Sequence, residues 1–190
     1  MNNIISPEKP KILLSSNITS VFGDSSMGKS VFSLNLGNRT GQKVIHMDQL
    51  IFNNWREKHS VDYFVQNYHA ALNNGNCIID GNALDCIDER LNKSNALVFF
   101  DGDDNEIMTN FINRYKRIQA GLETYVGFPE IHESDCKTEK QIFTNAVNRT
   151  EKYIENKRHL KTKLIPFGNK LITIKNRNDL IALKQSLTQF

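Results

Sequence analysis

An eight-residue motif near the N-terminus constrains the fold of this 190-residue chain more than any other feature. Residues 23–30 read Gly-Asp-Ser-Ser-Met-Gly-Lys-Ser and match the pattern G-x-x-x-x-G-K-[ST]. The apolar run 18–22 comes directly before the motif, and a helix-compatible stretch begins at Lys29. Because this motif binds phosphate when it joins a strand to a helix, the sequence predicts a phosphate-binding loop.

Each residue type in this loop suits a bound nucleotide. Gly23 and Gly28 allow backbone conformations closed to other residues, so successive N–H groups can point at a phosphate beside a helix N-terminus. Lys29 would contact the β- and γ-phosphates, and the Ser30 hydroxyl would coordinate Mg²⁺. A glycine-rich turn without a ligand would explain the glycines but not these two side chains. We therefore expect ATP and Mg²⁺ as cofactors. The expected nucleotide contacts are Gly23, Asp24, Ser25, Ser26, Met27, Gly28, Lys29, Ser30 and Val31.

Short apolar runs rich in Ile, Val and Phe alternate with amphipathic stretches along the chain. The predicted strands are 18–22, 43–46, 77–80, 96–100 and 170–174. The predicted helices are 29–38, 61–72, 105–118, 140–157 and 178–187. This alternation is typical of a parallel sheet covered by helices. We therefore predict a three-layer α/β fold of the P-loop NTPase type with a five-stranded parallel sheet. Residues 18–190 would form one domain, and residues 1–17 would be an N-terminal extension, either an arm or an extra strand.

Composition narrows the class of protein further. A mass of 21.8 kDa and a mean hydropathy of −0.47 fit one globular domain. No apolar run approaches the roughly 20 residues of a membrane span, and residues 1–10 lack the plan of a signal peptide. We therefore expect a cytoplasmic location. Cys77, Cys86 and Cys136 are unevenly spaced without a C-x-x-C pair, which favours buried free thiols over disulfides or a zinc site.

The net charge of +3 hides a basic segment in the C-terminal third. Residues 137–177 contain eleven Lys or Arg residues but only three acidic ones. Such an excess favours anionic partners, with phosphorylated small molecules ahead of nucleic acid. The alternative is a solvated helix face, which needs no partner.

Two aspartates follow predicted strands at the edge where an open parallel sheet binds its ligands. Asp48 ends the stretch 45–48 and could orient an attacking hydroxyl and accept its proton, or it could be a helix N-cap. Asp80 follows the apolar run 77–79, as does the Walker B carboxylate that holds Mg²⁺. Gly81 would leave room for a substrate, although Asp-Gly is also a common turn pair. His46 is more often a packed, hydrogen-bonded side chain than a catalytic one.

Together these residues resemble the adenylate-kinase-like family of DNA topology modulation proteins. The resemblance covers roughly residues 18–188 and includes the loop 23–30, residues 45–48, Trp55, the run Ile-Ile-Asp-Gly-Asn at 78–82, Arg90, and Phe-Phe-Asp at 99–101. It implies a small P-loop kinase fold that uses ATP and magnesium. Asp48, Asp80, Gly81, Asn82 and Arg90 would then bind a substrate. Asn82 replaces the aromatic residue of nucleoside monophosphate kinases, so a standard nucleotide acceptor is not implied.

The resemblance also implies a helical lid at about residues 119–150. Arg114 and Arg117 share one face of the predicted helix 105–118, and the resemblance assigns them to the transferring phosphate. The alternative for both is a solvated helix charge. Arg149 or Arg158 would be further candidates, without a ranking between them. The chain departs from the family after residue 101, where Gly-Asp-Asp-Asn replaces the usual proline and arginine. An acidic patch there would repel a phosphorylated acceptor.

We therefore predict ATP-dependent phosphoryl transfer to a small molecule whose identity the sequence does not specify, with Lys29, Asp48, Arg114 and Arg117 as catalytic residues and Ser30 and Asp80 as magnesium ligands. A regulatory GTPase is excluded, because residues 92–95 fail the last position of N-K-x-D and no D-x-x-G occurs. The alternative is a P-loop ATPase with a regulatory role in DNA topology. The sequence shows no nucleic-acid-binding motif to support it.

Overall fold

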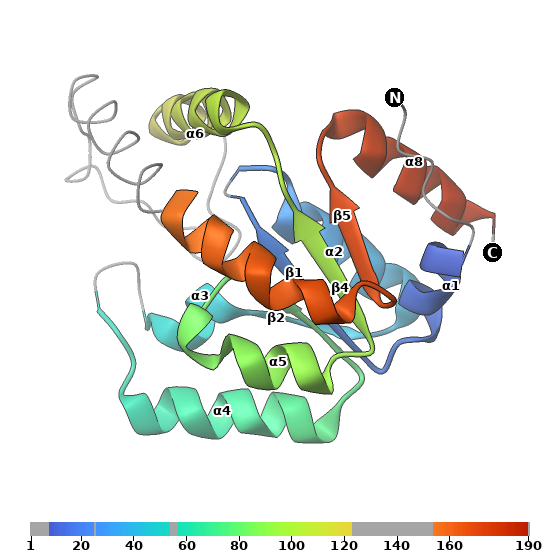
Figure 1. Cartoon of the computed structure of the whole chain (residues 1–190). Helices are drawn as coiled ribbons and strands as arrows, with labels where there is room; N and C mark the ends of the chain where they lie inside the picture. The colour runs from blue at the N-terminus through green and yellow to red at the C-terminus, as the bar shows by residue number, and fades with distance from the viewer. Residues whose placement is uncertain (1–7, 25, 54–56, 123–153, 190) are drawn as a thin grey trace.

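The computed structural model contains five parallel strands in one sheet, which confirms the predicted fold class (Figure 1). The strands are β1 (Ile18–Gly23), β2 (Lys43–His46), β3 (Cys77–Asp80), β4 (Ala96–Phe100) and β5 (Leu171–Ile174). Their spatial order is β2-β3-β1-β4-β5, and every neighbouring pair is parallel. The structure describes residues 8–24, 26–53, 57–122 and 154–189.

Helices cover both faces of the sheet and complete three layers (Figure 1). On one face lie α1 (Glu8–Ser15), α2 (Lys29–Thr40) and α8 (Arg177–Thr188), whose apolar side chains join one core cluster. On the other face lie α4 (Val61–Asn74), α5 (Ile87–Lys93) and a helix at residues 154–164. The strands β1, β3 and β4 are buried along their whole length, as expected for the centre of a parallel sheet.

Three parts of the chain differ from the predicted elements. Residues 8–15 form α1, which packs against α8, rather than an arm or an extra strand. The short helices α3 (Met47–Ile51) and α5, and the 3₁₀ turns Leu84–Cys86 and Ile165–Phe167, were not predicted. The predicted helix 140–157 continues to residue 164, while its start lies outside the described residues. Most of the predicted lid, from residue 123 onward, also lies outside them.

Both described cysteines are free thiols, as predicted, but Cys86 is only partly buried. Cys77 is buried, and this burial raises its pKa to about 11. Cys136 lies outside the described residues. The longest helix with both ends described is α6 (Asp104–Gln119), and none of the described helices has the length and apolar character of a membrane span.

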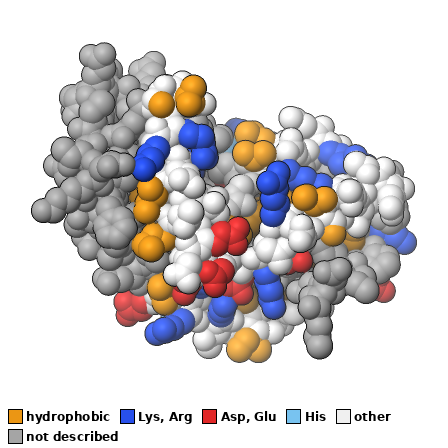
Figure 2. All heavy atoms as spheres, turned by 90° about the horizontal axis from the view of Figure 1, so that it is seen from above, with side chains coloured by type: hydrophobic (Ala, Val, Ile, Leu, Met, Phe, Trp, Pro, Cys, Tyr) orange, Lys and Arg blue, Asp and Glu red, His pale blue; other side chains and the backbone are white. Residues whose placement is uncertain are grey.

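The carboxyl ends of the strands meet at one edge of the sheet, because all five run in the same direction. Figure 2 looks down on this end of the molecule and shows a central group of acidic side chains with basic side chains on either side. Parallel α/β sheets bind their ligands at this edge. The loops that follow β1, β2, β3 and β4 therefore define the candidate site.

Candidate functional site

The loop between β1 and α2 has the backbone that its glycines predict. Gly23 has φ 116°, and a Cβ atom there would lie 2.1 Å from the carbonyl oxygen of Phe100. Gly28 is the N-cap of α2, with φ 87°. The N–H of Asp24 donates to the carbonyl oxygen of Phe100 at 2.8 Å. The first position of the loop thus accepts only glycine, and the loop is anchored to the end of β4.

Lys29 lies across this loop, since its Nζ donates to the carbonyl oxygen of Asp24 at 2.7 Å. Burial lowers the pKa of Lys29, while the charges of Asp80, Asp24 and Asp48 act to raise it and Arg114 acts to lower it. All these charged groups are therefore close enough to act on one ammonium. The structure thus brings together four residues singled out by the sequence: Lys29, Asp48, Asp80 and Arg114.

Asp80 ends β3 and is almost completely buried. Its Oδ2 lies 2.8 Å from Nδ1 of His46, which confirms the expectation that His46 is a hydrogen-bonded side chain. Burial acts to raise the pKa of Asp80, but the His46 imidazole, the Ser30 hydroxyl and the charge of Lys29 outweigh it and lower this pKa. Asp80 is therefore a carboxylate at neutral pH.

The surroundings of Asp80 fit a magnesium ion held together with a nucleotide. Its Oδ1 atom is buried and makes no hydrogen bond within the described residues, so an acceptor oxygen remains for a ligand. Carboxylate and hydroxyl oxygens, such as those of Asp80 and Ser30, are the hard ligands that Mg²⁺ prefers. The part of the chain that the structure describes holds no cluster of three His, Cys, Asp or Glu for a metal. An ion here would take its remaining ligands from phosphate and water, as Mg²⁺ usually does.

Asn82 and Arg90 support the phosphate loop. The Asn82 Oδ1 accepts from the N–H of Gly23 at 2.8 Å, and its Nδ2 donates to the Gly23 carbonyl at 3.1 Å. Arg90 is fully buried, and its Nη1 donates to the carbonyl oxygen of Gly81 at 2.8 Å. In these positions both side chains tie the turn after β3 to its neighbours. The substrate contacts expected for Gly81, Asn82 and Arg90 stay predictions.

Asp48 is not a helix N-cap. The N-cap of α3 is His46, and Asp48 is the second residue of this helix, with an exposed side chain. Its charge nevertheless acts on Lys29. This position rules out the capping alternative.

The two arginines of α6 differ in their surroundings. Arg114 is half-buried and acts on the charge of Lys29, whereas Arg117 is exposed nearly one turn further along the helix. Arg158 is exposed on the 154–164 helix, and Arg149 lies outside the described residues. Among the described arginine candidates, Arg114 is therefore the one with an electrostatic effect on Lys29 to support its role.

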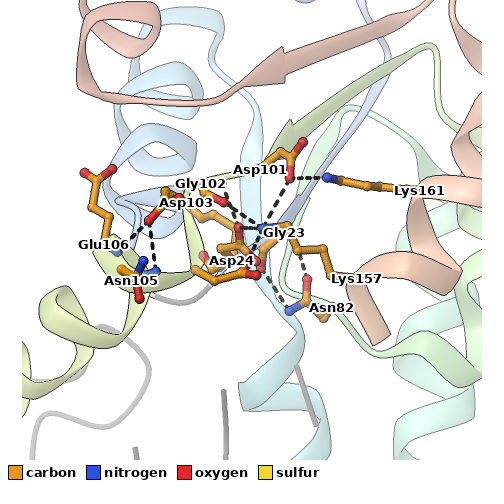
Figure 3. Close-up of polar contacts among 12 residues, drawn as sticks. Gly23, Asp24, Asn82, Asp101, Gly102, Asp103, Asn105, Glu106, Lys157 and Lys161 are labelled. Carbon is orange, nitrogen blue, oxygen red and sulfur yellow. Dashed lines mark hydrogen bonds and ion pairs between the residues drawn. The ribbon is translucent and has the colours of Figure 1, made fainter. Parts of the chain in front are cut away.

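The acidic residues after β4 are partly neutralised by ion pairs, and the expected repulsion of a phosphorylated acceptor stays a prediction. Asp103 Oδ1 accepts from the N–H of Asn105 at 3.0 Å and so helps to begin α6. Asp101 Oδ1 lies 2.7 Å from Nζ of Lys161 (Figure 3). Asp104 Oδ1 lies 3.1 Å from Nζ of Lys157. The sequence could not show these ion pairs, because their lysines come from more than 50 residues away.

Sequence reasoning missed Lys157 as a member of the site. Its Nζ lies 2.9 Å from Oδ2 of Asp24 and 2.7 Å from the carbonyl oxygen of Gly102 (Figure 3). Burial raises the pKa of Asp24, and the charge of Asp101 acts in the same direction, while Lys157 and the N–H of Gly102 oppose this shift. Lys157 lies three and seven residues before the buried Leu160 and Leu164. A lysine at helical spacing from apolar residues is the sequence feature that could have indicated its burial.

A cavity of about 400 Å³ lies between the phosphate loop, the turn after β3 and the 154–164 helix. Gly23 and Asp24 form one wall, and Asn82, Asp85, Asn156 and Lys157 supply further polar groups. A volume of this size is sufficient for a small molecule.

No family model and no curated protein matches this chain. Among solved structures, a shikimate kinase from Bacteroides thetaiotaomicron is 13% identical with a TM-score of 0.48, covering 92% of this chain and 96% of that one. An uncharacterized protein from Eubacterium ventriosum is 14% identical with a TM-score of 0.47, covering 91% and 98%. A gluconokinase from Sinorhizobium meliloti is 16% identical with a TM-score of 0.38, covering 73% and 93%. Similarity at this level does not bear on function, so the functional argument depends on the site itself.

Proposed function

We propose that this chain transfers the γ-phosphoryl group of ATP to a small-molecule acceptor, in the manner of a nucleoside or nucleotide kinase. The observation that carries the proposal is that Lys29 of the phosphate loop lies within electrostatic range of Asp48, Asp80 and Arg114. A protein that only binds a nucleotide needs the loop and its lysine. A second, exposed carboxylate in the position of Asp48 is what a transfer reaction adds.

In the proposed reaction, Asp48 orients the acceptor hydroxyl and takes its proton as the oxygen attacks the γ-phosphorus. A new bond forms between this oxygen and phosphorus while the bond to the β–γ bridging oxygen breaks, and ADP leaves. Lys29 and Arg114 offset the negative charge on the transferring group, with Arg117 as a further candidate. Mg²⁺, when bound at Ser30 and Asp80, would supply additional charge neutralisation.

The acceptor is proposed to lie beside Asp48, whose exposed side chain it can reach. The cavity between the phosphate loop and the 154–164 helix is not assigned to it, because neither Asp48 nor Lys29 lines that cavity.

A regulatory ATPase acting on DNA remains the alternative, but the described lysines of the basic segment do not support it. Lys161 pairs with Asp101, Lys163 pairs with Asp88, and Lys170 donates to backbone carbonyls of Leu91 and Ser94. These charges are used within the fold. They therefore do not form the continuous basic face that would favour nucleic acid.

A screen with ATP labelled at the γ-phosphate would test the proposal. Candidate acceptors with free hydroxyl groups and their phosphorylated counterparts are compared, and Lys29→Ala is included as an inactive control. We expect label on at least one hydroxyl compound with wild-type protein and none with the variant. Release of labelled phosphate only, with no labelled product from any acceptor, would favour the ATPase alternative.

A further inference from the structure

The buried ammonium of Lys157 connects the 154–164 helix to the phosphate loop. Lys157 is 8% exposed, and its Nζ contacts acceptors from two separate loops. One is Asp24, in the phosphate loop after β1. The others follow β4: Asp101 at 3.3 Å, Gly102 at 2.7 Å and Asp104 at 3.1 Å. Since an ammonium has only three donors, its bonding capacity is filled by these partners.

Asp24 contacts both Lys157 and Lys29. Its carboxylate Oδ2 accepts from the N–H of Gly102 at 2.7 Å as well as pairing with Lys157. Its own carbonyl oxygen accepts from Nζ of Lys29 at 2.7 Å. Lys157, Asp24 and Lys29 therefore form a continuous chain of contacts from the helix to the side chain that we assign to the phosphates.

The charge of Lys157 affects how strongly the loop would attract the phosphates of a nucleotide. Asp24, Asp101 and Asp104 would present three negative charges beside the loop, against the positive charges of Lys157 and Lys161. Loss of Lys157 would leave the buried Asp24 without its cation and increase repulsion toward a bound phosphate. It would also remove the contact that keeps Asp24 in place.

The geometry points to Lys157 as a positioning residue. It holds Asp24 in place, and Asp24 in turn holds the phosphate loop. In this way Lys157 couples the packing of the 154–164 helix to nucleotide binding. This inference rests on the proposed function, because it assumes that the loop binds a nucleotide. Coupling between two events is reciprocal. Nucleotide binding should therefore also hold the helix more firmly against the sheet.

Hydrogen exchange of the wild-type protein with and without MgADP tests the coupling directly. We expect MgADP to slow exchange in the 154–164 helix as well as in the loop, while α4, on the same face of the sheet, serves as the reference. If MgADP binds and protects the loop but not this helix, the coupling is wrong and the proposed function stands. If calorimetry shows no binding of MgADP at all, the proposed function itself fails.

Lys157→Met should weaken MgADP binding at least tenfold and abolish the nucleotide-dependent protection of the helix. The matched control is Lys163→Met, on the same helix, whose partner Asp88 is exposed. It should leave both measurements unchanged. Affinity is measured at a temperature where each variant is fully folded. If Lys157 only stabilised the fold, the affinity for MgADP would then be unchanged. If Lys157→Met does not fold, the hydrogen exchange of the wild-type protein with and without MgADP decides the inference by itself. Wild-type affinity and protection in folded Lys157→Met would overturn the inference.

The double variant Asp24→Asn/Lys157→Met separates the route through Asp24 from a direct effect on the nucleotide. If Lys157 acts through Asp24, the double variant should bind MgADP no more weakly than Lys157→Met alone. Losses that add up independently would contradict this route.

Discussion

Asp24 and Asp80 are both aspartates at the end of a buried parallel strand, yet their surroundings give them different roles. Asp24 accepts from a backbone N–H and pairs with Lys157, while burial raises its pKa. Both carboxylates leave a buried Oδ1 atom without a hydrogen bond inside the described residues. Asp80 bonds to His46 through Oδ2, and its pKa is lowered. Asp24 is thus held by a helix lysine and a loop N–H, whereas Asp80 is kept charged close to Ser30 and Lys29, where Mg²⁺ would bind. Position in the sequence does not distinguish them, but their partners do.

The largest expected effect is a loss of stability when Lys157, the cation paired with Asp24, is removed. Lys157→Met should lower the free energy of unfolding by about 3–5 kcal/mol, because a buried carboxylate loses its partner. Lys163→Met, which breaks an exposed pair on the same helix, should cost no more than about 1 kcal/mol. Urea denaturation of both variants measures the difference. Equal costs would show that the buried pair is no more important than a surface one.

Substitution of Asp80 should mainly reduce activity. Asp80→Asn removes the charge that holds Mg²⁺ and should lower turnover by about 10²–10³-fold, equivalent to roughly 3–4 kcal/mol. The activity that remains should need more magnesium. Transfer assays across a magnesium series would show this, with Asp24→Asn as the comparison. If Asp24→Asn shifts the magnesium requirement as much as Asp80→Asn does, the proposed division of roles is wrong.

Asp48 tests whether the site catalyses transfer or only binds a nucleotide. Asp48→Asn should reduce turnover by about 10²-fold as a lost general base, with little change in the Kd for ATP. The matched control is Asp62→Asn, which removes an acidic residue from the first turn of α4 in the same way. Turnover and Kd are measured for both variants. Wild-type turnover in Asp48→Asn would remove its catalytic role.

The smallest expected effect is a difference in how stability depends on pH. The lowered pKa of Asp80 stabilises the fold above the ordinary value of 3.8, and this contribution is lost as pH falls through the folded pKa. The raised pKa of Asp24 has the opposite sign, so its contribution is present below 3.8 and lost as pH rises through the folded pKa.

Urea unfolding of wild type, Asp24→Asn and Asp80→Asn between about pH 3 and 6 would reveal these two signs. The stability advantage of wild type over Asp80→Asn should grow with pH, and its advantage over Asp24→Asn should shrink. Each slope should stay below about 1.4 kcal/mol per pH unit, the limit for one proton. Slopes of the same sign would contradict the contrast between the two carboxylates.

The sheet could be predicted from sequence because its strands are short apolar runs between polar turns. Four strands begin where predicted, and β5 begins one residue later, at Leu171. The helices α3 and α5 escaped prediction because five and seven residues are too few to show a periodic apolar face. The α1 helix was missed because it contains Pro10 and few polar caps, although Leu13 reaches the core.

The candidate site could be predicted only where local motifs define it. The residues of the phosphate loop and Asp80 follow directly from the spacing of glycine, lysine and a strand-end carboxylate. Lys157 depends on contacts with Asp24 and Asp104, more than 50 residues away, and it stood among eleven basic residues that look alike in sequence. Substrate binding by Asn82 stays a prediction, and the bond of its amide to Gly23, 59 residues away, could not be foreseen from the sequence.

Calorimetry of ATP binding to wild type and to Lys29→Ala, each with and without Mg²⁺, tests the central claim most directly. The site geometry predicts that wild type binds ATP more tightly with Mg²⁺, and that Lys29→Ala loses most of this affinity because the loop no longer offers a cation to the phosphates. Equal ATP affinity in the two proteins would contradict the assignment of residues 23–30 as the nucleotide site.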